Sequence, residues 1–202
     1  MLLDVWSLDS YIQILEVELP RVIEQERKRL WKNVEPGDEQ QIHYAEIAEY
    51  QLDEGITTRL LTGTALIATW ATYESVVKRT AKRIQQSKNL RLKLRDIKGS
   101  FPESARIYFE DVLQFNLHPP GTDWNRLSII YGLRNVLAHA NGLLEDVPEN
   151  DRKKIEEWVA AFDGLKIADG YLIISIEFVR RVFNFTSELL STLGTRVDRM
   201  PV

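Results

Sequence analysis

The chain has 202 residues, 44% of them hydrophobic, and a formal net charge of −4 at neutral pH. This length fits one domain, or one domain with an N-terminal extension, and the apolar fraction suffices for a sizeable core. The absence of cysteine excludes disulfides, thiolate metal sites and cysteine nucleophiles, and suits a reducing cytoplasm. No signal peptide or membrane span is expected, because the N-terminus lacks a basic region and the apolar stretches are short.

The first quarter of the chain predicts two helices. The apolar spacing of residues 5–33 is that of a long amphipathic helix, which Pro20 is expected to kink or to divide in two. A second helix is predicted over residues 39–53. Residues 1–54 are therefore interpreted as an N-terminal helical extension that packs on a main domain of residues 55–202.

The longest helical pattern covers residues 56–86 and passes from an apolar first half to a basic second half. A polar connector of residues 87–100 follows, predicted as a short strand or an irregular basic arm. From Lys78 to Lys98 there are nine basic residues against a single acidic one, Asp96. Such a block is more often a solvated face than a binding site, but it is also where contacts to nucleic-acid phosphates are expected. The candidate RNA-binding residues on the helix are Lys78, Arg79, Lys82 and Arg83.

The middle of the chain predicts two further helices around a loop. Pro102 begins a helix that extends to about Phe115. His118, in the loop that follows, is interpreted as an ordinary loop residue. Asp123 is suited to cap the N-terminus of the next helix, predicted over residues 124–142.

The C-terminal part of the chain predicts a helix, a hairpin and a last helix. The first helix covers residues 152–163, and residues 164–174 resemble a small β-hairpin that turns at Asp169 and Gly170. The last helix covers residues 176–196. Together the elements predict an all-α fold, a bundle of four to five core helices with a small C-terminal β-hairpin.

The helix of residues 124–142 has an apolar face for the core and an opposite face of small or polar residues. The apolar stripe is Leu127, Ile130, Leu133, Leu137, Ala140 and Leu144, and the opposite face is Ser128, Gly132, Asn135 and His139. Arg134 and His139 are five residues apart, about 140° around the axis, so they do not easily converge within one helix. Two arrangements would unite them: a helix end at Asn141 and Gly142 that lets His139 swing, or a second copy of the helix across a two-fold axis.

The string Arg134-Asn135-x-x-x-His139 resembles the signature of the HEPN superfamily of small all-helical domains, over residues 55–196. The resemblance implies a protein of bacterial toxin–antitoxin or phage-defence systems, in which the arginine and histidine of two protomers meet at a dimer interface and cleave RNA without a metal. It also implies that a polar residue on the preceding helix, here Glu74, orients the arginine or the histidine; a plain surface glutamate is an equally good interpretation. Without the resemblance, Arg134 is a solvated flank residue and His139 a charge favoured at a helix end.

The function implied by this resemblance is that of a metal-independent endoribonuclease. His139 would act as general base on the ribose 2′-OH, while Arg134 would hold the phosphate and its developing charge. Asn135 would orient the imidazole or bond a phosphate oxygen, with Glu74 and Asn141 as supporting residues. The expected partners are RNA, a second copy of the chain and an antitoxin or defence-system protein. Family members silenced by nucleotidyl transfer carry a tyrosine at the position of Asn141, so that form of control is not expected here.

Other chemistry is not indicated by the sequence. There is no glycine-rich phosphate loop, no His-Glu-x-x-His and no Gly-x-Ser-x-Gly motif. The histidines are scattered, and the adjacent carboxylates Asp53-Glu54 and Glu110-Asp111 would point apart on a helix, so no metal and no cofactor are expected. Two other functions fit the same helix: a non-catalytic HEPN-like module that binds a nucleotide or a protein, and a purely structural helical dimer.

Overall fold

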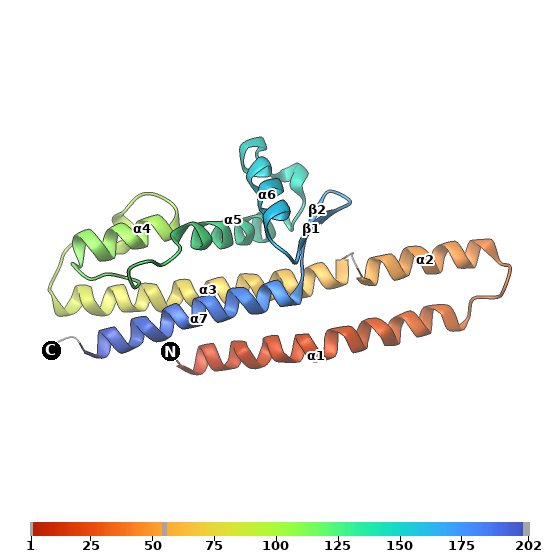
Figure 1. Ribbon diagram of the computed structural model, residues 1–202, viewed down its shortest axis with the longest axis horizontal. Coiled ribbons are helices and arrows are strands. Elements are labelled where there is room, and N and C mark those ends of the chain that lie inside the picture. The colour runs from red at the N-terminus through yellow and green to blue at the C-terminus, as the bar shows by residue number, and fades with distance from the viewer. Residues whose placement is uncertain (1, 54–55, 200–202) are drawn as a thin grey trace.

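The computed structural model describes residues 2–53 and 56–199 and is mainly helical (Figure 1). In chain order the elements are α1 (Leu2–Lys32), α2 (Glu39–Asp53), α3 (Ile56–Ser87), η1 (Leu94–Asp96), α4 (Phe101–Ile107), η2 (Tyr108–Val112), α5 (Trp124–Ala140), η3 (Leu144–Asp146), α6 (Glu149–Ala161), β1 (Leu165–Ala168), β2 (Tyr171–Ile174) and α7 (Ile176–Asp198). The prediction of an all-α fold with a small C-terminal hairpin is confirmed. Among the described residues, no helix is long and apolar enough to cross a membrane.

The central element is α3, which packs against α1, α2, α5 and α7 (Figure 1). Its largest buried side chains recur at three- and four-residue steps and are at most 2% exposed: Leu66, Trp70, Tyr73, Val77 and Ile84. This spacing places them on one continuous stripe of the helix. Burying each such side chain is worth about 1.5–3 kcal/mol relative to leaving it in water, so this stripe anchors the whole bundle.

The first helix, α1, is continuous through Pro20, so the predicted division at this proline is wrong. The proline ring is exposed, whereas Leu15 and Leu19, which precede it, are buried and hold the helix in the bundle. Arg180 of α7 adds two hydrogen bonds of 2.8 Å to the carboxylate of Glu16. Tertiary packing thus outweighs the loss of one backbone hydrogen bond at the proline.

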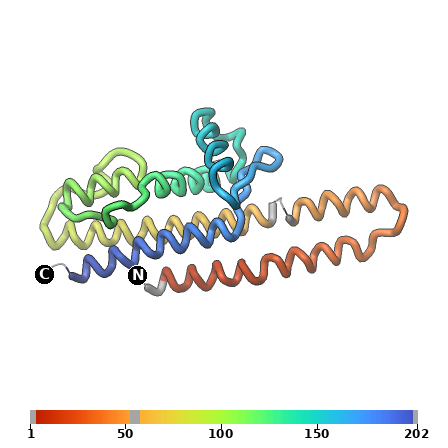
Figure 2. The backbone as a smooth tube through the Cα atoms, viewed as in Figure 1, coloured from red at the N-terminus to blue at the C-terminus, as the bar shows by residue number. Residues whose placement is uncertain are grey.

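The end of α1 and the antiparallel α2 project beyond the other helices (Figure 1). Glu49 of α2 ties the two together, since it accepts from Trp31 Nε1 at 2.7 Å and pairs with Arg27 at 2.7 Å. At the opposite end, Leu8 and Ile12 belong to the same hydrophobic core as α3 and α7. There the beginning of α1 lies beside α7, whose C-terminal end continues past it (Figure 2). The first half of α1 is therefore part of the main core.

The hairpin forms where it was predicted. β1 and β2 pair antiparallel, and the register places Ala168 opposite Tyr171. Between them Asp169 and Gly170 have φ angles of 48° and 77°. A two-residue hairpin turn with positive φ at both positions matches the twist of the strands, which is why an Asp-Gly pair suits it.

The segment from the connector to Phe115 differs from its prediction in two respects. The connector contains a single 3-10 turn, η1, and no strand. The helix predicted from Pro102 ends early as α4 and continues as the π-helical turn η2. The wider turn keeps Tyr108 and Phe109, which are adjacent in sequence, both buried.

His118 is a core residue, contrary to its interpretation as an ordinary loop residue. Its side chain is 4% exposed and lies between Tyr73 of α3 and Trp124 of α5. Nε2 is hydrogen-bonded to the Tyr73 hydroxyl at 2.6 Å, and Nδ1 has no partner among the described residues. Burial, assisted by the charge of Arg196, lowers the pKa of His118 from 6.5 to about 4.

We expect His118 to make the protein less stable in acid. Between pH 6.5 and pH 4 the unfolded chain holds a proton on this residue that the folded protein does not, so its contribution is complete above pH 6.5 and is lost as the pH falls toward 4. The loss should be roughly 3 kcal/mol. Urea unfolding at pH 7 and at pH 4.5 should show a smaller pH dependence for His118→Gln, which retains a polar group near Tyr73. The exposed His43→Ala is the control, and an unchanged pH dependence in His118→Gln would contradict the assignment.

Candidate functional site

The motif helix α5 is capped at both ends. The Asp123 carboxylate accepts from the backbone N–H of Arg126 at 2.9 Å, as predicted. At the other end Asn141 adopts the left-handed conformation with φ 49°, and its carbonyl accepts from the buried Arg59 of α3 at 3.0 Å. The Arg59 guanidinium also lies 3.9 Å from the ring centroid of Tyr171 in β2. One arginine therefore joins α3, the end of α5 and the hairpin.

Gly142 completes this helix end. Its φ is 81°, and a Cβ at this position would lie 3.2 Å from the carbonyl oxygen of Leu172. The Gly142 carbonyl in turn accepts from the Leu172 backbone N–H at 2.8 Å. The chain just after His139 is thus fixed to the hairpin by backbone hydrogen bonding and by close packing.

Arg134, Asn135 and His139 lie on the outer part of α5. Arg134 Nη1 donates to Asn135 Oδ1 at 3.0 Å, and both residues are half-buried. His139 is exposed one turn after Asn135. The Arg134 guanidinium therefore lies beside Asn135, and among the described residues no hydrogen bond joins it to His139. Arg134 Nε is buried and has no partner among the described residues, so it keeps a free donor.

A groove of about 730 Å³ separates α5 from α6 and contains Asn135 and His139 on one wall. Trp158 lies on its α6 side, close to Gly132, where a Cβ would lie 2.5 Å from the indole ring. A second copy of α5 therefore has no access to Gly132 on the small face, because α6 of the same chain packs there. Arg134 is not among the groove residues.

Charged residues line the α6 side of this groove. They are Asp146, Asp151 and Lys154, and Lys154 pairs with Asp151 at 3.0 Å. Val147 and Ile155 add a buried apolar surface next to them. The groove therefore combines an exposed imidazole, an apolar wall and the carboxylate of Asp146, which forms no ion pair with the described residues.

Glu74 is bound within its own helix. Its carboxylate accepts from Trp70 Nε1 at 3.1 Å and forms an ion pair with Lys78. Trp70 contacts the ring of Tyr131 in α5. The hydrogen bonds described for Glu74 are therefore all within α3. Glu74 is connected to α5 only indirectly, through the contact between Trp70 and Tyr131.

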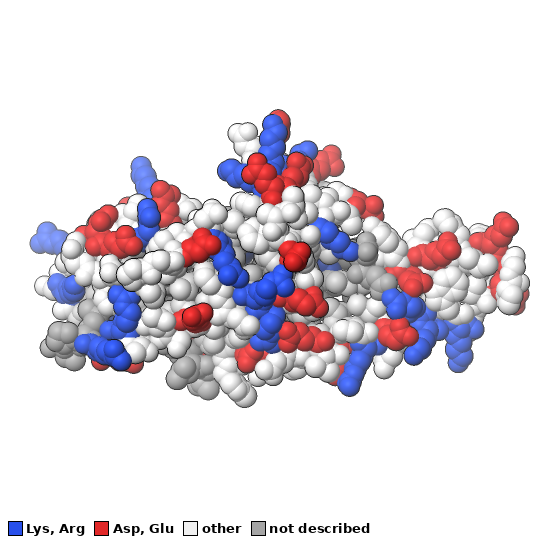
Figure 3. Space-filling model, in the orientation of Figure 1, with Lys and Arg blue, Asp and Glu red and all other residues white. Residues whose placement is uncertain are grey.

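The four candidate RNA-binding residues are divided between two faces of α3. Arg79 pairs with Asp4 of α1 at 2.8 Å, and Arg83 lies 3.9 Å from Asp198 of α7. Lys78 and Lys82 lie on an adjacent face of the helix, toward the connector. Residues four apart lie on the same face of a helix, so Arg79 lies near Arg83 and Lys78 near Lys82. The two pairs are offset by one residue, which places them about 100° apart around the axis of α3. Basic and acidic side chains are also interspersed on the face that Figure 3 shows.

Metal-binding residue types do not gather within the described part of the chain: no group of three or more His, Asp or Glu side chains is placed to hold an ion. Comparisons with protein-family models, with curated proteins and with solved structures found no match to this chain.

The structure separates residues needed for the core of α5 from those on its surface. Leu133 is fully buried, so Leu133→Ala should lower the free energy of unfolding by about 2–5 kcal/mol. His139→Ala should change it by no more than about 0.5 kcal/mol, because the side chain is exposed. Chemical denaturation of both variants at neutral pH tests this. Equal destabilisation would mean that the imidazole is part of the core packing.

Proposed function

We propose that the chain is a metal-independent endoribonuclease with a HEPN-like site composed from the motif helices of two copies. The observation that supports this most directly is the hydrogen bond from Arg134 to Asn135. It holds a guanidinium beside an amide, and the exposed imidazole of His139 lies one turn after that amide on α5. A phosphate-binding cation and a proton-transfer group are what cleavage of RNA by its own 2′-OH requires.

The reaction would proceed by attack within the substrate. The His139 imidazole takes the proton of the ribose 2′-OH, and the 2′-oxygen forms a bond to phosphorus while the bond from phosphorus to the 5′-oxygen breaks. The leaving 5′-oxygen takes up a proton, which gives a 2′,3′-cyclic phosphate and a 5′-OH end. Arg134 stabilises the additional negative charge on the pentacoordinate phosphorus. DNA lacks the 2′-OH and would not be cleaved.

The helix end argues for a second copy rather than for a mobile histidine. The backbone after His139 is fixed by the bond from Arg59 to Asn141 and by the pairing of Gly142 with Leu172, so the end of α5 does not let the imidazole swing. A second copy of α5 that packs across the exposed residues Ala138 and His139 would instead bring its own Arg134 to this histidine. The exposed Ala138, small and next to His139, leaves room for such an approach.

The setting that we propose is a toxin–antitoxin or phage-defence system of the cytoplasm, in which a partner protein restrains the nuclease. The groove beside His139 also favours a second function, that of a non-catalytic module that binds a nucleotide or a protein segment. Its volume of about 730 Å³ and its half-exposed Trp158 suit a bound ligand.

The composite site can be tested by mixing two inactive proteins. Arg134→Ala and His139→Ala should each reduce RNA cleavage by about 10² to 10⁴, because each removes an interaction of the transition state. Mixed dimers of the two variants contain one complete site, so an equimolar mixture should recover about a quarter of the parent activity. Leu133→Ala is the control for loss of activity through unfolding.

Three outcomes of this experiment decide between the functions. Recovery in the mixture, with a dimer mass in light scattering, supports the composite site. Absence of recovery places both groups in one protomer. Parent-like cleavage by both folded single variants, or no cleavage by the parent protein, contradicts the nuclease and favours the binding module.

Cleavage should not depend on a divalent cation. His139 and Arg134 supply the base and the positive charge, so EDTA should change the rate by less than about twofold. The measurement is the cleavage rate of a single-stranded RNA with EDTA and after the addition of excess magnesium. A rate that vanishes with EDTA and returns with magnesium would refute the mechanism.

A further inference from the structure

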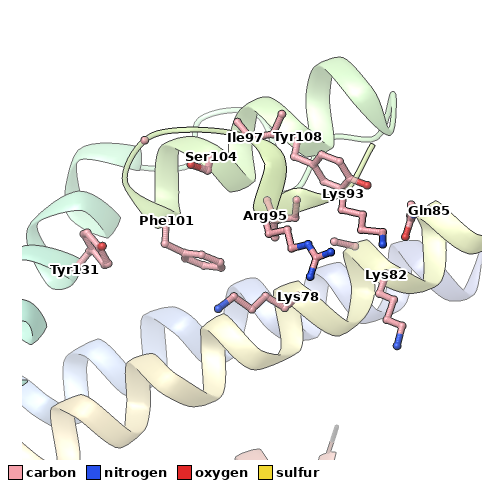
Figure 4. Close-up of a pocket in the computed structure, with 13 residues that line it drawn as sticks. Lys78, Lys82, Gln85, Lys93, Arg95, Ile97, Phe101, Ser104, Tyr108 and Tyr131 are labelled. Carbon is pink, nitrogen blue, oxygen red and sulfur yellow. The ribbon is translucent and has the colours of Figure 1, made fainter. Parts of the chain in front are cut away.

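A second cavity, the cationic cleft, lies between the basic half of α3 and the connector with α4 (Figure 4). Its volume is about 600 Å³. Four cationic side chains line it, two from α3 and two from the connector, and its lining contains no carboxylate: the cations are Lys78, Lys82, Lys93 and Arg95. Figure 4 shows Lys93 and Arg95 reaching from the connector toward α3, above Lys78.

The connector is held in place by hydrogen bonds on both sides of the cleft. Gln85 Nε2 of α3 donates to the Leu90 carbonyl at 2.6 Å, and the Tyr108 hydroxyl donates to the Leu92 carbonyl at 2.7 Å. The Lys93 backbone N–H donates to the Asp96 carboxylate at 2.9 Å, which fixes the turn η1. The predicted irregular arm is thus an ordered wall, and its cations are positioned before any ligand arrives.

The positive charge of the cleft is only partly neutralised. Three carboxylates lie next to it: Glu74 pairs with Lys78, Asp96 lies 3.9 Å from Arg95, and the Glu103 carboxylate lies beside Gly99. Lys82 and Lys93 form no ion pair with any described residue. Charges of one sign that converge on a concave surface raise the local concentration of oppositely charged ligands.

Apolar side chains form the rest of the cleft. Phe101 and Tyr131 are half-buried, and the Lys78 ammonium lies 5.4 Å from the centroid of the Phe101 ring. Gly99 closes one side, and its φ of 127° is a backbone conformation that residues with a side chain rarely adopt. A cavity of this size with a few convergent polar groups is typical of small-molecule sites.

We infer that the cationic cleft binds a small ligand bearing two or more phosphoryl groups, with its phosphates on Lys93 and Arg95. Phosphoryl oxygens match these donors, and a di- or triphosphate carries enough negative charge to satisfy cations that the fold leaves unpaired. An organic group on such a ligand would lie against Phe101 and Tyr131.

The surroundings favour a small ligand over a nucleic-acid strand. Tyr131 lines both this cleft and the groove beside His139, so a strand leaving the cleft in that direction would enter the groove. In that groove Lys154 is already paired with Asp151, so its described lining offers no run of unpaired Lys or Arg side chains along which a phosphate backbone could continue from the cleft. The inference does not depend on RNA cleavage, since none of the cations in the cleft belongs to the motif.

Calorimetric titration of the full chain with sodium tripolyphosphate, and separately with ATP, tests the site. Both should bind the parent protein. Lys93→Ala and Arg95→Ala should each weaken binding about tenfold, the loss expected for one charge-assisted contact. Both side chains are exposed and should not be needed for folding, which thermal unfolding checks. The matched controls are Arg91→Ala and Lys98→Ala, exposed cations of the same connector outside the cleft, which should bind like the parent protein.

Three results would overturn the inference. One is the absence of binding of either polyphosphate to the parent protein. Another is an equal loss in Arg91→Ala and Lys98→Ala, which would show only a general charge effect. The third is a single-stranded oligonucleotide, without a terminal phosphate, that binds through Lys93 and Arg95 and is not displaced by tripolyphosphate, because this would assign the cleft to a strand. RNA cleavage is not a readout here, so the nuclease and this site can fail separately.

Discussion

The structure depends on the burial of one long helix, α3, on several sides at once. Trp70 and Tyr73 are held by Phe101 and Tyr131, so the same aromatic cluster fixes α4 and α5 above α3. Because α3 is locked in rotation about its axis, every later residue on it has a determined direction. Because of this constraint Arg79 pairs with Asp4 of α1, whereas Lys78 and Lys82 lie on the side of the connector. The cationic cleft forms on that side.

Local signals in the sequence were sufficient for most of the secondary structure. The cap at Asp123, the left-handed end at Asn141 and the turn at Asp169 each depend on interactions within a few residues, and each was found where it was predicted. Pro20 is different, since the packing that keeps α1 continuous comes from side chains far along the chain. His118 is a similar case: a buried loop histidine has no periodic pattern, and its partner Tyr73 is 45 residues away.

The candidate site was predictable to a smaller extent. The helix that carries Arg134 and His139, and its outward face, follow from the apolar stripe of α5. The position of the Arg134 guanidinium could not be predicted from the helix geometry, because it depends on the conformation of a long side chain and on its hydrogen bond to Asn135. Arg59 was missed altogether; the signal available was a charged residue within the apolar first half of α3, which requires a buried partner.

The contact between Gly132 and Trp158 links the outside of the molecule to the motif helix. The indole occupies the place that a side chain on α5 would take, and its other parts remain half-exposed on α6. A molecule bound in the groove would lie against the exposed part of this ring, because the indole forms one wall of that space. The fluorescence of Trp158 would therefore report the occupancy of the groove in a variant whose other four tryptophans are replaced.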